Sequence, residues 1–465
     1  MNKQTITSNS SALPHIIKTT FTAGLLPVIV LLLSLQTTQA GSATWNLNPA
    51  SGDWNTAANW TPATVPNGPA DTAQFAVSNT TGISISGPTE VNGIQFNPGA
   101  SAFTITAGPS LTFAISGVGV TNNSGIAQNF VTAVDGAGNQ GAIFFTNSAT
   151  AGNGAFNNHG GTVSGASGGQ TQFFATSSAN NATLTAEGGT GGSAGGIVFF
   201  FENSSGGTAR IEVFGNGTLD ISSHFAPGVT VGSIEGDGLI SLGANNLTVG
   251  STNLRTTFSG VIQDGGIAGG AGGSLIKIGG GSNLTLSGAN TYTGGTTVTA
   301  GTLFVTNRRG SATGSDTVRV NAGKLGGTGK ISGNVFVGDG SAPEAFITPG
   351  TTAIFPATLT IQRKLTLRAD GTFHFGFKSS NITADKIIAR GVTIDSGALI
   401  FFDHVDVGTF PLGTVFTAID NTAATPIAGT FANLADGATF TIDNITFQAD
   451  YQGGDGNDLT LTVVP

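Results

Sequence analysis

Residues 275–307 read LIKIGGGSNLTLSGANTYTGGTTVTAGTLFVTN. Apolar and polar residues alternate there in short runs, such as Leu284-Thr285-Leu286 and Leu303-Phe304-Val305-Thr306, and Gly, Asn and Ser separate the runs. A period of two is typical of β-strands that bury one face, and the separating residues favour tight turns. The same pattern continues through the chain after residue 40, with no convincing amphipathic helix. The sequence therefore predicts an all-β protein.

A second repeat is centred on paired phenylalanines. The pairs Phe144-Phe145, Phe173-Phe174 and Phe200-Phe201 lie 29 and 27 residues apart. Each pair precedes a polar turn, then an apolar residue (Phe156, Leu184 or Ile211), then a glycine turn (Gly160, Gly188 or Gly215). A period near 28 residues, with Phe at a fixed phase, predicts one solenoid coil per repeat and a Phe ladder inside the stack.

The stretch at 275–307 closely resembles the passenger-associated transport repeat, also called the autotransporter-associated β-strand repeat. The matching core runs from Leu284 to Val298 and continues through Ala300-Gly301-Thr302-Leu303. The resemblance implies a right-handed parallel β-helix, in which Asn290 and the paired Gly294-Gly295 supply corners between faces. The fold we predict is thus a right-handed parallel β-helix with a C-terminal globular β segment.

Two further stretches resemble the usual partners of that repeat. One is an opening block with Trp45, Gly52-Asp53-Trp54-Asn55 and Asn59-Trp60. The other is a closing block that ends in Tyr451-Gln452-Gly453-Gly454-Asp455-Gly456-Asn457-Asp458-Leu459. Complete autotransporters end in a membrane β-barrel with aromatic girdles. The chain has two Tyr, its three Trp lie near the N-terminus, and it ends in Val463-Val464-Pro465, so we expect no translocator barrel.

Residues 1–40 predict a signal peptide. Lys3 and Lys18 make the start positive, Ala23 to Leu35 is apolar, and Thr38-Gln39-Ala40 ends in the small residue that a signal peptidase requires. We then expect an N-terminal capping region at 41–110, Phe-rich solenoid repeats at 111–274, the transport repeat at 275–307 and a C-terminal β segment at 308–465. The β-helix itself is expected to run to about residue 345. No transmembrane segment is predicted after the signal.

Composition narrows the function. Charged residues make up 9 % of the chain, its net charge is −9 and Cys is absent, so no disulfide or thiolate site is possible. Between Lys18 and Arg210 there is no Lys or Arg, and phosphate contacts require them. We therefore predict no nucleic-acid partner. Candidate partners are cell-surface or extracellular matrix components, and the oligomeric state stays open.

Four candidate sites each have a structural interpretation that we favour. The run Gly453 to Asp458 resembles one calcium-binding repeat, but such sites need consecutive copies, and a turn explains it. Asp403-His404-Val405-Asp406 places one His and one carboxylate on a strand face, which falls short of a catalytic zinc site. The N-terminal Trp trio is interpreted as a cap on the open end of the helix rather than a sugar-binding patch.

The fourth candidate is the charge-dense set in the closing segment, whose members do not recur at one phase: Arg363-Lys364, Arg368, Asp370, Lys378, Asp385, Lys386 and Arg390. We predict no catalytic, cofactor-binding or metal-binding residue and no cofactor. The predicted function is a non-enzymatic β-helical stalk or adhesin-like scaffold, secreted or at the cell surface of a Gram-negative-type bacterium. The alternatives are a β-helix polysaccharide lyase or glycoside hydrolase, which needs clustered carboxylates on one face, and a module that assists export of a partner.

Overall fold

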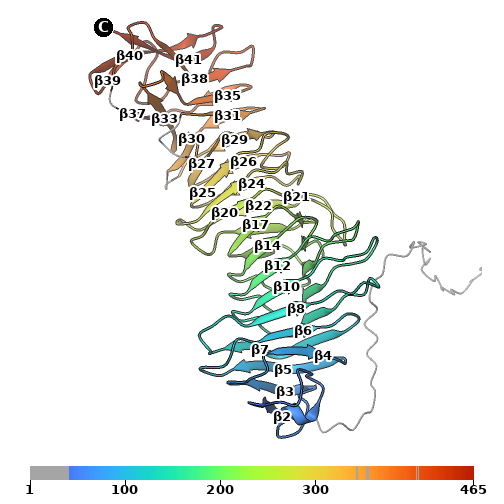
Figure 1. The fold of residues 1–465 in the computed structure, drawn as a ribbon. Helices are drawn as coiled ribbons and strands as arrows, with labels where there is room; N and C mark the ends of the chain where they lie inside the picture. Colours follow the sequence, from blue (N-terminus) through green and yellow to red (C-terminus); the bar gives the residue numbers. More distant parts are fainter. Residues whose placement is uncertain (1–40, 342–343, 352–355, 405, 407) are drawn as a thin grey trace, which may run out of the picture. The chain divides into compact units, whose positions relative to one another are not determined.

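Four largely parallel β-sheets form the sides of a stack of coils in the computed structural model (Figure 1). The structure describes residues 41–341, 344–351, 356–404, 406 and 408–465. The proposed signal peptide at 1–40 therefore lies outside the described residues. Among those that are described, the helical element is one short 3-10 turn, η1 (Ala57–Asn59), and no helix is long and apolar enough to cross a membrane.

Sheets I and II form the coils of the N-terminal half. Sheet I comprises eleven strands: β1 (Ala43–Trp45), β2 (Trp60–Thr61), β3 (Gly68–Phe75), β5 (Thr89–Phe96), β7 (Thr112–Asn122), β9 (Ala142–Phe145), β11 (Gln170–Phe173), β13 (Ile197–Phe200), β15 (Thr218–Asp220), β18 (Leu239–Ser241) and β21 (Val261–Gln263).

Sheet II continues along both halves and has fifteen strands: β4 (Gly82–Ile85), β6 (Thr104–Ala107), β8 (Asn129–Thr132), β10 (Ala155–Asn158), β12 (Thr183–Ala186), β14 (Arg210–Val213), β17 (Ser233–Gly236), β20 (Arg255–Phe258), β23 (Asn283–Leu286), β25 (Thr302–Val305), β27 (Gly323–Gly327), β30 (Ala345–Pro349), β33 (Gly371–Lys378), β34 (Thr383–Ala384) and β37 (Leu399–His404).

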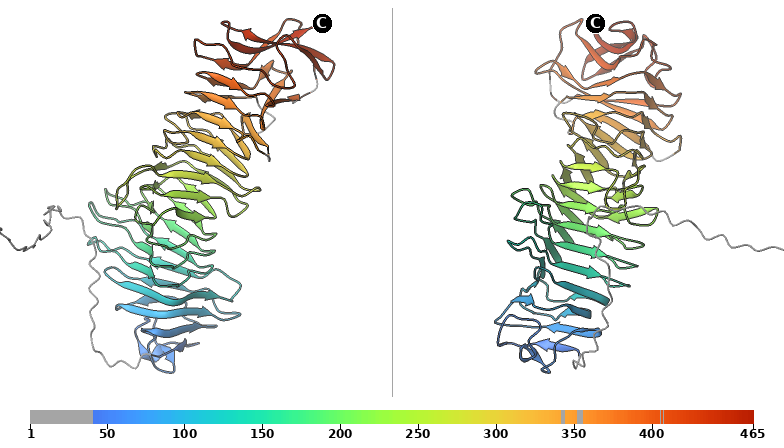
Figure 2. Two further views of the ribbon diagram at one scale, coloured as in Figure 1. Left: turned by 180° about the vertical axis from the view of Figure 1, so that it is seen from behind. Right: turned by 90° about the vertical axis from the view of Figure 1, so that its right-hand side faces the viewer.

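Two more sheets complete the later coils (Figure 2). Sheet III comprises β16 (Gly228–Val231), β19 (Asn246–Val249), β22 (Ser274–Lys277), β24 (Thr296–Val298), β26 (Val318–Val320), β29 (Val335–Val337), β32 (Leu365–Leu367) and β36 (Val392–Ile394). Sheet IV comprises β28 (Lys330–Ile331), β31 (Thr358–Ile361), β35 (Lys386–Ala389), β38 (Val415–Asn421), β39 (Thr439–Ile442), β40 (Ile445–Gly453) and β41 (Asp458–Val464).

The parallel coils continue well beyond residue 345, where we had expected a more globular segment to begin. Strands β31, β35 and β38 still pair in parallel, and β32 still pairs in parallel with β36. Pairing becomes antiparallel between β38 and β41, between β40 and β41, and in the hairpin of β39 and β40. The closing segment is therefore an antiparallel cap on a stack that reaches Asn421.

Inward-facing side chains form ladders because parallel strands keep one register from coil to coil. The rings of Phe145, Phe173 and Phe200 are fully buried and stack with centroids 4.9 Å apart at each step. On the facing sheet, Phe156, Leu184 and Ile211 are direct partners. Phe145 touches Phe156 edge to face at 5.3 Å, which joins the two ladders into one core.

The predicted Phe ladder forms, and its register shifts by one residue at the first pair. The structure places Phe145, rather than Phe144, beside Phe173, and Phe173 beside Phe200. Phe144, Phe174 and Phe201 are consequently half-exposed on the outer face of sheet I. The predicted equivalence of the three corner glycines is confirmed. Gly160 lies so close to the backbone of Gly188 that a side chain would not fit, and Gly188 lies beside Gly215 in the next coil.

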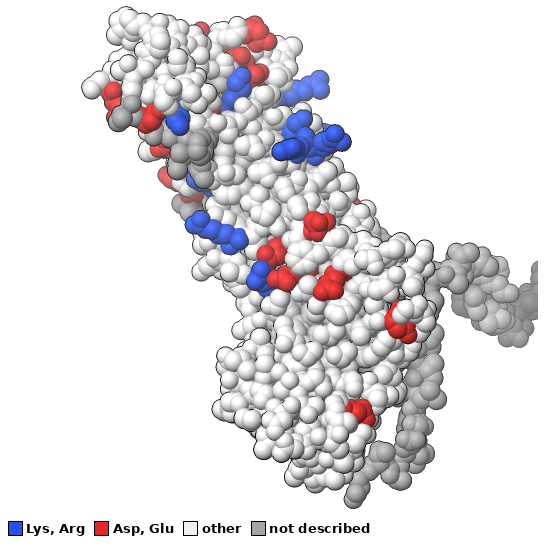
Figure 3. Space-filling model, in the orientation of Figure 1, with Lys and Arg blue, Asp and Glu red and all other residues white. Residues whose placement is uncertain are grey.

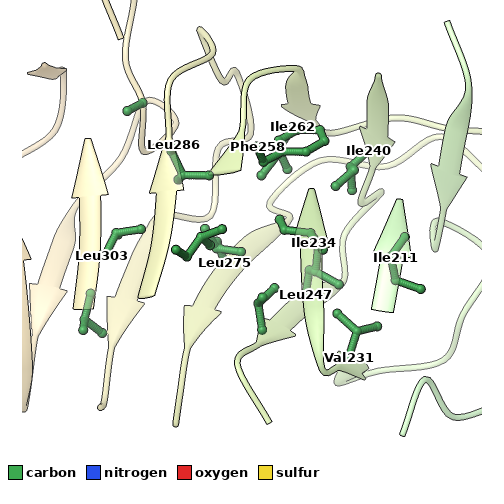
Figure 4. Close-up of a cluster of buried hydrophobic side chains, with 14 of the residues drawn as sticks. Ile211, Val231, Ile234, Ile240, Leu247, Phe258, Ile262, Leu275, Leu286 and Leu303 are labelled. Carbon is green, nitrogen blue, oxygen red and sulfur yellow. The ribbon is translucent and has the colours of Figure 1, made fainter. Parts of the chain in front are cut away.

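The transport repeat forms the coils of β22 to β25, where sheet I has ended and sheet IV has not begun. Its inward residues join the continuous core of three sheets, in which Leu286 lies beside Phe258 and Leu303 lies on the next strand along the stack (Figure 4). On the side without a strand, buried Asn290 accepts the Ile262 N–H at 2.8 Å and donates to the Ala312 carbonyl at 2.5 Å. Gly295 adopts φ +85°, so both predicted corner residues act as corners.

Candidate functional site

A small cleft on the outer face of sheet II gathers the titratable groups that come closest to an active site. His374 on β33 faces Asp403 on β37, the neighbouring parallel strand, with Nδ1 and Oδ2 3.7 Å apart. The His374 ring packs between Phe346 and Phe401, with centroids 5.2 and 5.1 Å away. Burial lowers the pKa of His374 and the field of Lys324 adds to that, whereas Asp403 opposes both. His374 is therefore biased toward the neutral form.

Asp385 lies at the base of the same cleft and serves the backbone. One carboxylate oxygen accepts the Ala357 N–H and the other accepts the Gly376 N–H, each at 2.8 Å. Burial raises the pKa of Asp385 to about 7 despite these two donors. A carboxyl group with that pKa suits proton transfer, yet both of its oxygens are already engaged in holding β31 and β33.

The size of this cleft limits its chemistry. Its volume is about 60 Å³, whereas clefts that enclose organic ligands span roughly 300–1,000 Å³. A sugar ring does not fit between Lys324 and Asp403, and the 3.7 Å gap between His374 and Asp403 is longer than a hydrogen bond. The cleft has room for water or a small ion, so it gives no support to polysaccharide cleavage.

The Asp403-His404-Val405-Asp406 run divides between two faces, as its alternation predicts. Asp403 faces outward to His374, whereas the His404 ring is buried and stacks on Phe377 at 4.9 Å. His404 Nδ1 lies 2.8 Å from Asp443 Oδ2, and Nε2 lies 3.5 Å from Asp406 Oδ1. Val405 is outside the described residues. No group of three His, Asp or Glu able to hold a metal occurs in the described part of the chain.

The Gly453 to Asp458 run is the turn between antiparallel β40 and β41. Buried Asp458 accepts the Asn421 N–H at 2.8 Å, and Asn457 donates to the Ala423 carbonyl at 2.5 Å. These two side chains therefore tie the hairpin to β38 and the residues that follow it. Asp455 alone projects as an exposed carboxylate, which is consistent with the predicted turn.

The N-terminal tryptophans are part of the core. Trp45, Trp54 and Trp60 are each at most 1 % exposed, and all three pack against Phe75. Their indole N–H groups donate to the carbonyls of Thr80, Pro66 and Trp54. Buried rings cannot stack on a sugar, so the trio packs the core of the first coils.

Sequence reasoning missed the aromatic residues on the outer face of sheet I. Phe174 and Phe201 are half-exposed, and their rings stack 4.7 Å apart at 2°. Phe199 lies beside Phe201 at 5.4 Å. Because each ring covers a face of the next, the ladder presents ring edges and offers little open face to a sugar. The alternation along β9 could have revealed this outer aromatic face. Buried Ile143 and Phe145 both face inward, so Phe144 between them must face outward.

Comparisons with known proteins agree with this fold. The family model of the passenger-associated transport repeat matches residues 275–305. Over 170 residues the chain is 32 % identical to "Adhesin BmaC autotransporter" of Brucella suis biovar 1 (strain 1330). That match covers 34 % of this chain and 5 % of the relative, so the chain spans a small part of that protein's length. The protein is therefore a β-solenoid that contains a passenger-associated transport repeat at residues 275–305.

Proposed function

We propose that the protein is an exported, non-enzymatic scaffold with an adhesin-like role, secreted or held at the surface of a Gram-negative-type bacterium. The observation that carries the proposal is the position of the transport repeat. Its strands β22 to β25 pair in parallel with the coils before and after them. The repeat is thus an integral part of one continuous solenoid, and the similarity to an adhesin supports the role.

The lateral surface supports a scaffold as well. Residues 41–209 contain no Lys or Arg, and the visible face of these coils carries few charged groups (Figure 3). An acid–base site on a sheet face needs paired carboxylates or a carboxylate with a cation. The cleft at His374 has such groups but too little room for a sugar, so we do not favour a polysaccharide-cleaving enzyme.

Cell fractionation tests the proposal. An antibody against the solenoid should detect the protein in the medium or on intact cells, where added proteinase should reach it. Retention in the cytoplasm would contradict export. Purified protein should release no reducing ends from a panel of polysaccharides. Release that is abolished by His374→Ala would establish the enzyme instead.

A further inference from the structure

The basic residues of this acidic protein are concentrated in one part of the stack. Residues 308–390 contain eleven of the sixteen Lys and Arg but only five of the twenty-five Asp and Glu. Residues 41–307 and 391–465 are both net acidic. Figure 3 shows Lys and Arg gathered on the C-terminal half of the visible face. This uneven distribution directs anionic ligands to one segment.

Two arginines form an organised pair on the outer face of sheet III. Arg319 on β26 is the direct register partner of Phe336 on β29, and Arg368 follows β32, the next strand. The Cζ atoms of Arg319 and Arg368 lie 5.2 and 5.5 Å from the Phe336 ring centroid. Such cation–π contacts hold a guanidinium without consuming its N–H donors.

The N–H donors of this arginine pair are available to a ligand. Among the described residues, neither guanidinium lies within 4.0 Å of a carboxylate oxygen or donates a hydrogen bond. The pair borders a cleft of about 190 Å³ with Asn321, Gly338 and Asp339. Asp339 accepts from Ser341, and Asp370, beside the cleft, accepts the N–H groups of Asp339 and Gly340. The hydrogen bonds from Ser341, and to a lesser extent the field of Arg368, lower the pKa of Asp339, so Arg368 interacts with this carboxylate through its charge and keeps its N–H donors.

A second group, the corner cations Arg363, Lys364 and Arg390, lies just before the first residues of β32 and β36. Arg363 and Lys364 directly precede β32, and Arg390 precedes β36. The Arg390 N–H donates to the Arg363 carbonyl at 3.0 Å, which makes the two corners neighbours. All three side chains are exposed. Lys364 and Arg368 are four residues apart, or about 13 Å along an extended strand, so one small anion cannot span both groups.

The surroundings favour a polymer recognised by its anionic groups alone. The outward residues of sheet III that follow one another in register are Thr230, Thr248, Ile276, Thr297, Arg319, Phe336, Thr366 and Thr393. The single aromatic ring among them is already occupied by two guanidiniums. Stacking of single-stranded nucleobases needs open aromatic faces, and interfacial membrane binding needs an exposed apolar face. Neither is present on this sheet. Duplex DNA presents phosphates without open bases and is therefore the competing anionic polymer against which binding has to be measured.

We infer that the arginine pair and the corner cations together bind an anionic polysaccharide through its sulfate or carboxylate groups. Guanidinium groups match such planar or tetrahedral oxyanions with paired N–H donors. The inference rests on the adhesin-like function proposed above, because it names the class of surface that the solenoid would contact.

Binding of the full purified chain to four probes tests this inference. The probes are heparin (sulfated), polygalacturonate (carboxylated), a DNA duplex, and vesicles that contain phosphatidylglycerol. Heparin, polygalacturonate or both should bind at physiological ionic strength, and the other two should bind at least tenfold more weakly. Arg319→Ser with Arg368→Ser should weaken polysaccharide binding at least tenfold and reduce the slope of log affinity against log salt by roughly two.

Arg255→Ser is the matched control, because it removes an exposed arginine outside the basic segment and should change affinity less than twofold. Thermal melts of all variants verify that they remain folded. The inference is overturned if neither polysaccharide binds, if DNA or vesicles bind as tightly, or if the double variant keeps full affinity. Loss of binding with intact surface location would leave the proposed function standing, whereas a cytoplasmic location would overturn that function and not the binding.

Discussion

The ring of Phe173 lies 4.9 Å from the ring of Phe200, and the two planes differ by 9°. This stacking continues to Phe145 on the other side, so three successive coils share one aromatic column. Each fully buried side chain of this size contributes roughly 1.5–3 kcal/mol by leaving water. Because a coil contacts mainly its neighbours, a defect in the column should act locally.

Phe173→Asp should destabilise the coils around it by several kcal/mol, because it replaces a buried ring with an unpaired charge. Phe174→Asp is the matched control, since that ring is half-exposed on the opposite face of the strand. Thermal melts followed by circular dichroism should show a large fall for Phe173→Asp and a small one for Phe174→Asp. Equal melting temperatures in the two variants would place Phe173 at the surface.

Asn290→Ala should destabilise the transport repeat by about 2–4 kcal/mol, because it leaves the buried Ile262 N–H and Ala312 carbonyl without partners. Asn253→Ala removes an exposed amide one coil earlier and should cost little. Hydrogen exchange measured near residues 262 and 312 would locate the effect. Unchanged protection of both segments would show that Asn290 is dispensable.

Lys277 should make stability depend on pH. Its ammonium group is buried within the transport repeat, donates to Ser282 Oγ and the Ile278 carbonyl at 2.5 Å, and has a pKa lowered by burial to about 8. In the unfolded chain, Lys277 keeps the ordinary pKa near 10.5. Between pH 8 and pH 10.5 the unfolded state therefore binds more protons than the folded state, and the free energy of unfolding should rise with pH. Lys277→Met should flatten that rise in a denaturant titration. A rise of the same size in both proteins would assign it to other groups.

Asp385 should make the free energy of unfolding fall with rising pH, in a lower pH range than that of Lys277. Burial raises its pKa from 3.8 to about 7, so its protonated form is favoured in the folded state. Stability should therefore fall as pH rises from about 4 to 7, by up to about 1.4 kcal/mol per pH unit. Asp385→Asn should remove this fall, although it also loses one of two acceptors for backbone N–H groups. An identical pH profile in the variant would show that Asp385 ionises freely in the folded protein.

Arg210 is the first trypsin site after residue 40, and the folded protein should resist cleavage there. It lies within β14, paired in parallel on both sides, and forms ion pairs with Glu212 and Glu235. Digestion of native and urea-unfolded protein, analysed by mass spectrometry, compares the two states. Rapid native cleavage after Arg210 would argue against a packed solenoid at this position.

The solenoid and its corners could be predicted because they follow from local pattern. Alternation marks the strands, and Gly160, Gly188 and Gly215 mark equivalent corners. The register was harder, since the spacing of the Phe pairs does not fix which ring of each pair faces inward, and the structure pairs Phe145 with Phe173. Contacts between coils were not predictable. His374 meets Asp403, and Arg319 shares Phe336 with Arg368, only because the loop lengths set the register between distant strands.

The coils that contain the transport repeat have unequal lengths and an unbroken register. Arg255 pairs with Asn283, which is 28 residues later, yet Asn283 pairs with Thr302 after only 19. The longer coil includes β21, the last strand of sheet I, and has longer corners, whereas the shorter coil has no strand at that position. The rise from one strand to the next stays the same. A gene for such a protein can gain or lose codons at a corner without disturbing the spacing of its neighbours. The outline of the surface is thereby free to diversify under selection, while the column of strands behind it is inherited intact.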